Sequence, residues 1–173
     1  MAEEPGKNRG VLLQKKLQAI PVALAGILLV FAVIAQPNLS LFTGLWHIQL
    51  SEAGLITDPM ATGGVGAALL NAALVLLICT LIIRSMKLPF TGVTFACLFM
   101  MAGFALLGKN LVNIAPIILG GWLYARYRRE PFSQYIYMTL FGTCLSPMVS
   151  FLLVHLLVCS LWSVGPPWWP AAW

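Results

Sequence analysis

The stretch that decides the fold reads Val65-Gly-Ala-Ala-Leu-Leu-Asn-Ala-Ala-Leu-Val-Leu-Leu-Ile-Cys-Thr-Leu-Ile-Ile83, and it contains no charged side chain. A helix needs about 20 predominantly apolar residues to cross the hydrocarbon core of a bilayer. This stretch meets the requirement, and Arg84 and Lys87 follow it directly. It therefore predicts a transmembrane helix whose end is basic.

The rest of the chain has the same character. Of its 173 residues, 60% are apolar and only 9% are charged, whereas a soluble domain has about 25% charged residues. Its mean hydropathy is +0.91. This composition excludes a soluble enzyme, a disordered chain and a secreted disulfide scaffold. It predicts an all-α fold, a polytopic transmembrane helical bundle.

Apolar runs on both sides of the central stretch predict about five crossings. The runs cover residues 17–35, 65–83, 88–107, 111–124 and 132–164. They form one transmembrane domain, 17–164, between an N-terminal segment, 1–16, and a Pro/Trp-rich tail, 165–173. The first run exceeds the apolar core of a signal peptide, so we interpret it as an uncleaved span. The fourth run is short and the fifth is interrupted near Pro147, which makes them candidates for a re-entrant and a broken helix.

The distribution of basic residues predicts the orientation. Lys and Arg precede the first run and follow the second and the fourth runs. Membrane proteins concentrate these residues in cytoplasmic loops. We therefore expect the N-terminus inside, in the cytoplasm, and the C-terminus outside. The same rule explains the net charge of +5 without a nucleic-acid partner.

The densest polar break is Gly108-Lys109-Asn110, which Asn113 follows. A charge at membrane depth is costly, so it normally faces a cavity, a partner or the interface. One interpretation is a binding mouth for a small polar or anionic solute. Asn110 would cap the next helix there, and Lys109 and the helix dipole would attract negative charge. The other interpretation is an extracellular hairpin, turned at Gly108, in which Lys109 extends to the interface.

Three other polar residues are candidates for the same solute site: Asn71, Thr143 and Ser146. Asn71 would form a hydrogen bond across a helix contact or line a cavity. Thr143 and Ser146 precede Pro147, which removes a helical donor and frees a carbonyl group. They would satisfy backbone groups at a kink or coordinate a solute in an unwound segment.

Two titratable residues, Asp58 and His155, are each expected to have a structural role, and the alternative for each is to bind an ion or a proton. Asp58 precedes a proline and is expected to cap a helix. His155 lies in an apolar run and is expected to form a hydrogen bond within the bundle. The small residues Gly63, Gly66 and Ala67 recur at helical spacing, which favours close packing of two helices.

No catalytic or metal-binding pattern is found in the sequence. The cysteines lie in apolar runs without zinc-site spacing and predict buried thiols: Cys79, Cys97, Cys144 and Cys159. No two acidic residues have metal-ligand spacing on one helix face. We therefore expect no enzyme activity, no metal and no cofactor. A membrane enzyme would require His47, Glu52 and Asp58 to meet.

Several of these motifs resemble a bacterial multi-pass membrane family known as a domain of unknown function. The most specific is Met101-Ala-Gly-Phe-Ala-Leu-Leu-Gly-Lys-Asn110, and another is Asn113-Ile-Ala-Pro-Ile-Ile-Leu-Gly-Gly-Trp-Leu-Tyr124. The resemblance covers residues 40–150, and the Pro/Trp-rich end departs from it. Members of that family have two related halves, and this chain resembles the first. The resemblance implies a bacterial cytoplasmic (inner) membrane protein, but no established activity and no catalytic residue.

These observations lead us to expect a channel- or transporter-like half with its solute site at the Gly-Lys-Asn break. An odd number of crossings would invert a second half joined to this one, and inverted repeats are common in transporters. The expected partners are the lipid bilayer, a second half or another membrane subunit, and a small polar solute. The alternative is a structural or assembly subunit of a membrane complex, without transport or catalysis.

Overall fold

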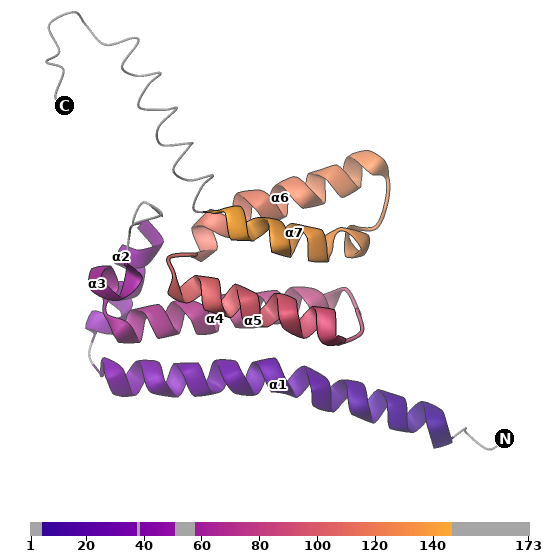
Figure 1. Ribbon diagram of the computed structural model, residues 1–173, viewed down its shortest axis with the longest axis horizontal. Helices are drawn as coiled ribbons and strands as arrows, with labels where there is room; N and C mark the ends of the chain where they lie inside the picture. The colour runs from indigo at the N-terminus through magenta and orange to yellow at the C-terminus, as the bar shows by residue number, and fades with distance from the viewer. Residues whose placement is uncertain (1–4, 38, 51–57, 147–173) are drawn as a thin grey trace, which may run out of the picture.

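The computed structural model describes residues 5–37, 39–50 and 58–146, and this part of the chain is all-helical, without strands (Figure 1). The helices, in chain order, are α1 (Pro5–Ala35), α2 (Ser40–Leu50), α3 (Pro59–Gly63), α4 (Val65–Ser85), α5 (Gly92–Leu106), α6 (Leu111–Arg128) and α7 (Ile136–Gly142). Short 3₁₀ turns cover Phe132–Gln134 and Thr143–Leu145.

The long helices lie side by side in three layers: α1, then α4 with α5, then α6 with α7 (Figure 1). Helix α4 is central because it contacts α1 on one side and α5 on the other, while α5 also contacts α7. The largest cluster of buried apolar residues includes Leu76, Ile83, Leu98 and Met101 from α4 and α5. Helices α2 and α3 contact the start of α4 and lie at one end of the bundle.

Within the described residues, two helical segments are long and apolar enough to cross a membrane: Leu12–Ala35 within α1, and Val65–Ser85, which is α4. They suggest membrane insertion. The apolar segments Gly92–Leu106 and Ile136–Leu145 are shorter. Of the five expected crossings, the first two therefore have the length and hydropathy of a span. The third and fourth runs form α5 and α6, and the described part of the fifth run, residues 132–146, contains α7.

Two helices extend further than the apolar runs that predict them. Helix α1 begins at Pro5, within the polar N-terminal segment, and α6 continues to Arg128 rather than ending at Tyr124. Arginines in the last turn of a helix interact favourably with the helix dipole, which explains the extension of α6. Helix α7 ends at Gly142 in a 3₁₀ turn. The predictions for Pro147, His155, Cys159, Glu52 and the tail lie outside the described residues.

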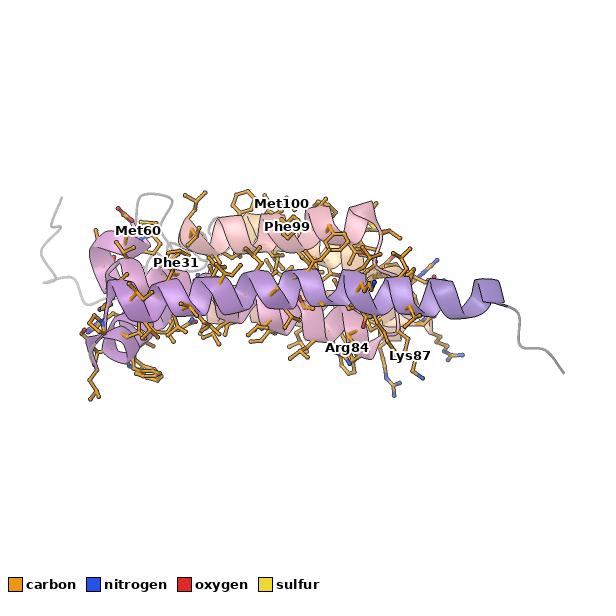
Figure 2. The ribbon with its side chains drawn as sticks, turned by 90° about the horizontal axis from the view of Figure 1, so that it is seen from below. Phe31, Met60, Arg84, Lys87, Phe99 and Met100 are labelled. Carbon is orange, nitrogen blue, oxygen red and sulfur yellow. The ribbon has the colours of Figure 1, made fainter. Side chains whose placement is uncertain are left out.

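Basic residues gather at one end of the bundle. The α4–α5 turn and the α6–α7 turn both lie at the end where α1 begins, opposite α2 and α3 (Figure 1). Figure 2 shows Arg84 and Lys87 at this end. The turns also carry three further basic residues: Arg126, Arg128 and Arg129. Lys109 lies at the opposite end, between α5 and α6.

Glycines permit the closest helix contacts. A Cβ atom on Gly66 of α4 would lie 2.7 Å from the carbonyl oxygen of Ala32 in α1 and would also overlap the side chain of Gln36. A Cβ atom on Gly121 of α6 would overlap the Thr139 side chain of α7. By contrast, a Cβ atom on Gly103 of α5 would meet nothing within 4 Å. Gly66 and Gly121 are therefore contact positions, and Gly103 is not.

We predict that Gly66→Ala lowers the stability of the protein by about 1–3 kcal/mol, because the added methyl group overlaps the α1 backbone. The matched substitution Gly103→Ala should be neutral or stabilising by up to about 1 kcal/mol, because alanine favours a helix and the site has space. Thermal unfolding of the two purified variants in one detergent measures the difference. Equal melting temperatures would contradict the close α1–α4 contact.

Candidate functional site

The candidate site is built around the break between α5 and α6. Helix α5 ends at Leu106, and Gly108 adopts φ = +102°, a conformation that glycine reaches without steric cost. The backbone N–H of Lys109 donates to the carbonyl oxygen of Phe104 at 3.1 Å, which closes the end of the helix. Asn110 then caps α6, because its Oδ1 accepts from the Asn113 N–H at 2.8 Å.

Lys109 is turned into the protein and is only 1% exposed. Its Nζ donates to the thioether Sδ of Met101 at 2.9 Å and lies 5.7 Å from the centroid of the Phe104 ring. Within the described residues the one ion pair is Arg128–Glu130, so no described carboxylate pairs with Lys109. The hairpin interpretation is therefore right about Gly108 as a turn, but Lys109 does not extend to the interface.

Asn71 of α4 ties this break to the centre of the bundle. It is fully buried, and its Nδ2 donates to the carbonyl oxygens of Ala105 at 3.0 Å and of Lys109 at 2.8 Å. Its Oδ1 accepts from Gln49 Nε2 of α2 at 3.0 Å. The Asn71 side chain thus forms three hydrogen bonds and connects α4 to both α2 and the end of α5.

Helix α2 covers the break from the end of the bundle. Besides the bond from Gln49, the buried Asn110 donates from Nδ2 to the carbonyl oxygen of Ile48 at 2.9 Å. The first residues of α6 and the last turn of α2 are thereby joined. The α2–α3 pair is held close by glycine, because a Cβ atom on Gly63 would lie 2.6 Å from the carbonyl oxygen of Gly44.

Thr143 contacts the same methionine, Met101, as Lys109 does. Its Oγ1 lies 3.1 Å from Met101 Sδ and 2.5 Å from the carbonyl oxygen of Leu140, and the side chain is buried. The Met101 sulfur therefore contacts both Lys109 and Thr143. Ser146 is also buried, and its Oγ lacks a hydrogen-bond partner within the described residues.

Two more polar atoms near the break lack a partner among the described residues. They are Nδ2 of Asn113, in the first turn of α6, and Oε1 of Gln49. Such buried atoms are unusual because an unmade hydrogen bond costs about 1–3 kcal/mol. Together with Lys109, they leave spare hydrogen-bonding capacity of both kinds, donor and acceptor, around the break.

The remaining candidates lie elsewhere. Asp58 is exposed at the start of α3, where its Oδ1 accepts from the Met60 N–H at 2.8 Å, the geometry of a helix cap. Ala67 and Gly66 face α2 and α1 at the start of α4, where the Ala67 N–H donates to Gln36 Oε1 at 3.2 Å. Described free cysteines are Cys79, Cys97 and Cys144. No group of described residues could hold a metal ion.

Sequence reasoning missed three contributors: Gln36, Gln49 and Met101. Gln36 directly follows the first apolar run, and Gln49 lies between two apolar residues near the end of α2. An amide next to apolar residues is a signal for a hydrogen bond between helices. Met101 offers no such signal, because an apolar residue in an apolar run is normally a core residue. Its role as acceptor depends on the turn at Gly108, which brings Lys109 back onto α5.

We predict that Asn71→Ala destabilises the protein by about 1–3 kcal/mol, because it leaves two buried carbonyl groups and one glutamine without their partner. The matched variant Asn113→Ala should cost less, since Asn113 Nδ2 has no described partner to lose. Thermal unfolding in detergent compares them. If Asn113→Ala were the more damaging change, the hydrogen-bond assignment at Asn71 would be wrong.

Comparison with known proteins adds the family. No curated protein and no solved structure matches the chain. The family described as "Protein of unknown function (DUF1576)" matches residues 37–166, a range that includes α2 to α7 and the break at Lys109. This match covers most of the sequence and agrees with the resemblance to a domain of unknown function. The chain therefore belongs to the DUF1576 family.

Proposed function

We propose that this protein is a channel- or transporter-like membrane protein, one half of a larger arrangement, that binds a small polar or anionic solute at the α5–α6 break. The observation that carries the proposal is the burial of Lys109 against a thioether and an aromatic ring, with no described carboxylate beside it. A buried cation without a counter-ion is expensive, so such residues in membrane proteins commonly mark a ligand or ion site.

The groups around Lys109 suit a small ligand with negative charge. The first turn of α6 presents the positive end of an 18-residue helix beside Lys109. Asn113 Nδ2 is a buried donor without a described partner. Thr143 shares the Met101 sulfur with Lys109. One lysine supplies one positive charge, and the amide and hydroxyl groups would orient the ligand.

The proposed setting is the bacterial cytoplasmic membrane. Two apolar helices suggest insertion, and the clustering of basic residues at one end of the bundle supports an orientation with that end in the cytoplasm. The break at Lys109 would then lie toward the outer side, beneath α2. A second half or another membrane subunit would complete the arrangement, and no catalytic step is part of the proposal.

Replacing Lys109 by methionine separates a binding role from a structural one. We predict that Lys109→Met leaves the melting temperature unchanged or raises it, because an apolar side chain of similar length removes the cost of burying an unpaired charge. Lys109→Arg, which keeps the charge but enlarges the group, is the control and should destabilise. A clear fall in melting temperature for Lys109→Met would favour the structural-subunit alternative.

Access to position 109 tests whether the site is open to water. In a variant without the four native cysteines, Lys109→Cys should react with a membrane-impermeant thiol reagent from the outside only. It should react more slowly than Met60→Cys, which lies on the exposed surface of α3. Reaction as fast as at position 60 would indicate an ordinary surface turn, and no reaction from either side would indicate a sealed core. Both outcomes would overturn the solute site.

A further inference from the structure

The two turns at the basic end share one sequence motif. The α4–α5 turn reads Arg84-Ser-Met-Lys-Leu-Pro-Phe90, and the α6–α7 turn reads Arg126-Tyr-Arg-Arg-Glu-Pro-Phe132. Both follow the pattern Arg-x-x-Lys/Arg-x-Pro-Phe. Asn71 precedes Arg84 by the same number of residues as Asn113 precedes Arg126. The α4–α5 and α6–α7 hairpins therefore share an internal repeat that runs in the same direction through the bundle.

The repeated motif produces the same backbone geometry in both places. After α4, the Lys87 N–H donates to the carbonyl oxygen of Arg84 at 3.0 Å, and the Leu88 N–H donates to that of Ile83 at 3.4 Å. After α6, the equivalent bonds run from Arg129 to Arg126 at 3.2 Å and from Glu130 to Ala125 at 3.0 Å. Both helices thus end in the Schellman arrangement.

In each turn a basic residue occupies the position that normally belongs to glycine. Lys87 has φ = +55° and Arg129 has φ = +57°, and these are the only non-glycine residues with positive φ in the described part of the chain. A left-handed conformation is sterically unfavourable for a residue that carries a side chain. Lys87 and Arg129 adopt this unfavourable conformation at the same motif position, which indicates that a cationic side chain has a function there.

The side chains of the motif form an amphipathic edge. Arg84, Lys87, Arg126 and Arg129 are all exposed, and Figure 2 shows Arg84 and Lys87 extending from the basic end of the bundle. One helical turn before each arginine lies an exposed leucine, Leu81 at 60% and Leu123 at 52%.

The phenylalanine at the other end of each motif packs on the core, Phe90 as a buried member and Phe132 as a partly buried one. Each turn therefore joins cations to an apolar surface, and its phenylalanine holds it in place.

The four motif cations have no carboxylate partner within the described residues. Glu130 instead pairs at 3.9 Å with Arg128, which occupies a variable position of the motif, and it accepts a hydrogen bond from the Tyr135 hydroxyl. Glu130 is thus already engaged, and no described carboxylate competes with an external anion for the four motif cations.

We propose that the two Arg-x-x-Lys/Arg-x-Pro-Phe turns bind the phosphate groups of anionic phospholipids in the leaflet that faces the basic end. Within each turn the arginine and the left-handed Lys or Arg contact the phosphate, and Leu81 or Leu123 contacts the acyl chain. The apolar contact favours a lipid over free phosphate or a nucleic acid, because neither of those would use an exposed leucine. The site is independent of Lys109, which lies at the opposite end.

The test uses the full chain purified in a neutral detergent, with binding of phosphatidylglycerol and phosphatidylcholine measured by native mass spectrometry. Wild-type protein should bind phosphatidylglycerol preferentially. Arg84→Gln and Arg126→Gln should each weaken that binding about fivefold, the effect expected for one basic residue near an anionic lipid. Arg128→Gln removes the same charge from the same end, but Arg128 occupies a variable position of the motif and pairs with Glu130, so this variant should change the affinity less than twofold.

Two further variants exclude loss of the fold as the cause. Lys87→Gly and Arg129→Gly place glycine in the left-handed conformation that it prefers, so the turns should fold at least as stably as before. Their melting temperatures in detergent should be unchanged or higher, while phosphatidylglycerol binding falls about fivefold.

Three results would overturn the proposal. The first is equal loss of lipid binding in Arg84→Gln and Arg128→Gln, which would show a general effect of surface charge. The second is equal binding of phosphatidylcholine and phosphatidylglycerol. The third is displacement of phosphatidylglycerol by inorganic phosphate together with an unchanged affinity in Leu81→Gln, which would show a site for free phosphate instead of a lipid.

Discussion

The arrangement of the bundle depends on the Asn71 amide, which donates to the carbonyl oxygens of Ala105 and Lys109 and accepts from Gln49. These bonds hold the end of α5, and therefore the direction in which the chain leaves it, against the second turn of α4. In an apolar medium a carbonyl freed at a helix end needs such a partner. The irregular backbone at Gly108 is tolerated because Asn71 satisfies it and α2 covers it.

The charges of the protein are separated between the two ends of the bundle. Basic residues that are exposed gather at the two turns following α4 and α6, whereas Lys109 is buried beneath α2 at the opposite end. An exposed arginine at a turn keeps its solvation and interacts with a helix dipole or an anionic surface. A buried lysine has lost its solvation, so the burial of its charge is costly unless another group interacts with it. The two groups of cations are therefore suited to different roles.

The repeat of the α4–α5 and α6–α7 hairpins gives Asn71 and Asn113 equivalent positions with different environments. Both polar atoms of the Asn71 side chain form hydrogen bonds, whereas Asn113 Nδ2 has no partner among the described residues. Both hairpins begin at the end of the bundle where α2 and α3 lie, and both turn at the basic end (Figure 1). The repeat within this chain is therefore parallel. The inverted repeat expected from an odd number of crossings would relate this chain to a second half. It is a separate prediction from the parallel repeat of the two hairpins within this chain.

Local pattern was enough to predict much of this protein. The apolar runs around Val65–Ile83 predicted an all-helical chain, Asp58 and Asn110 were identified as helix caps from the residues that follow them, and the Gly-Lys-Asn break was recognised as the polar interruption between two helices. Each of these depends on residues close together in the sequence. The direction of the Lys109 side chain, its contact with Met101 and the partners of Asn71 could not be predicted in this way. They depend on which turn of α5 and which part of α2 meet the break, and that is decided only when the helices pack.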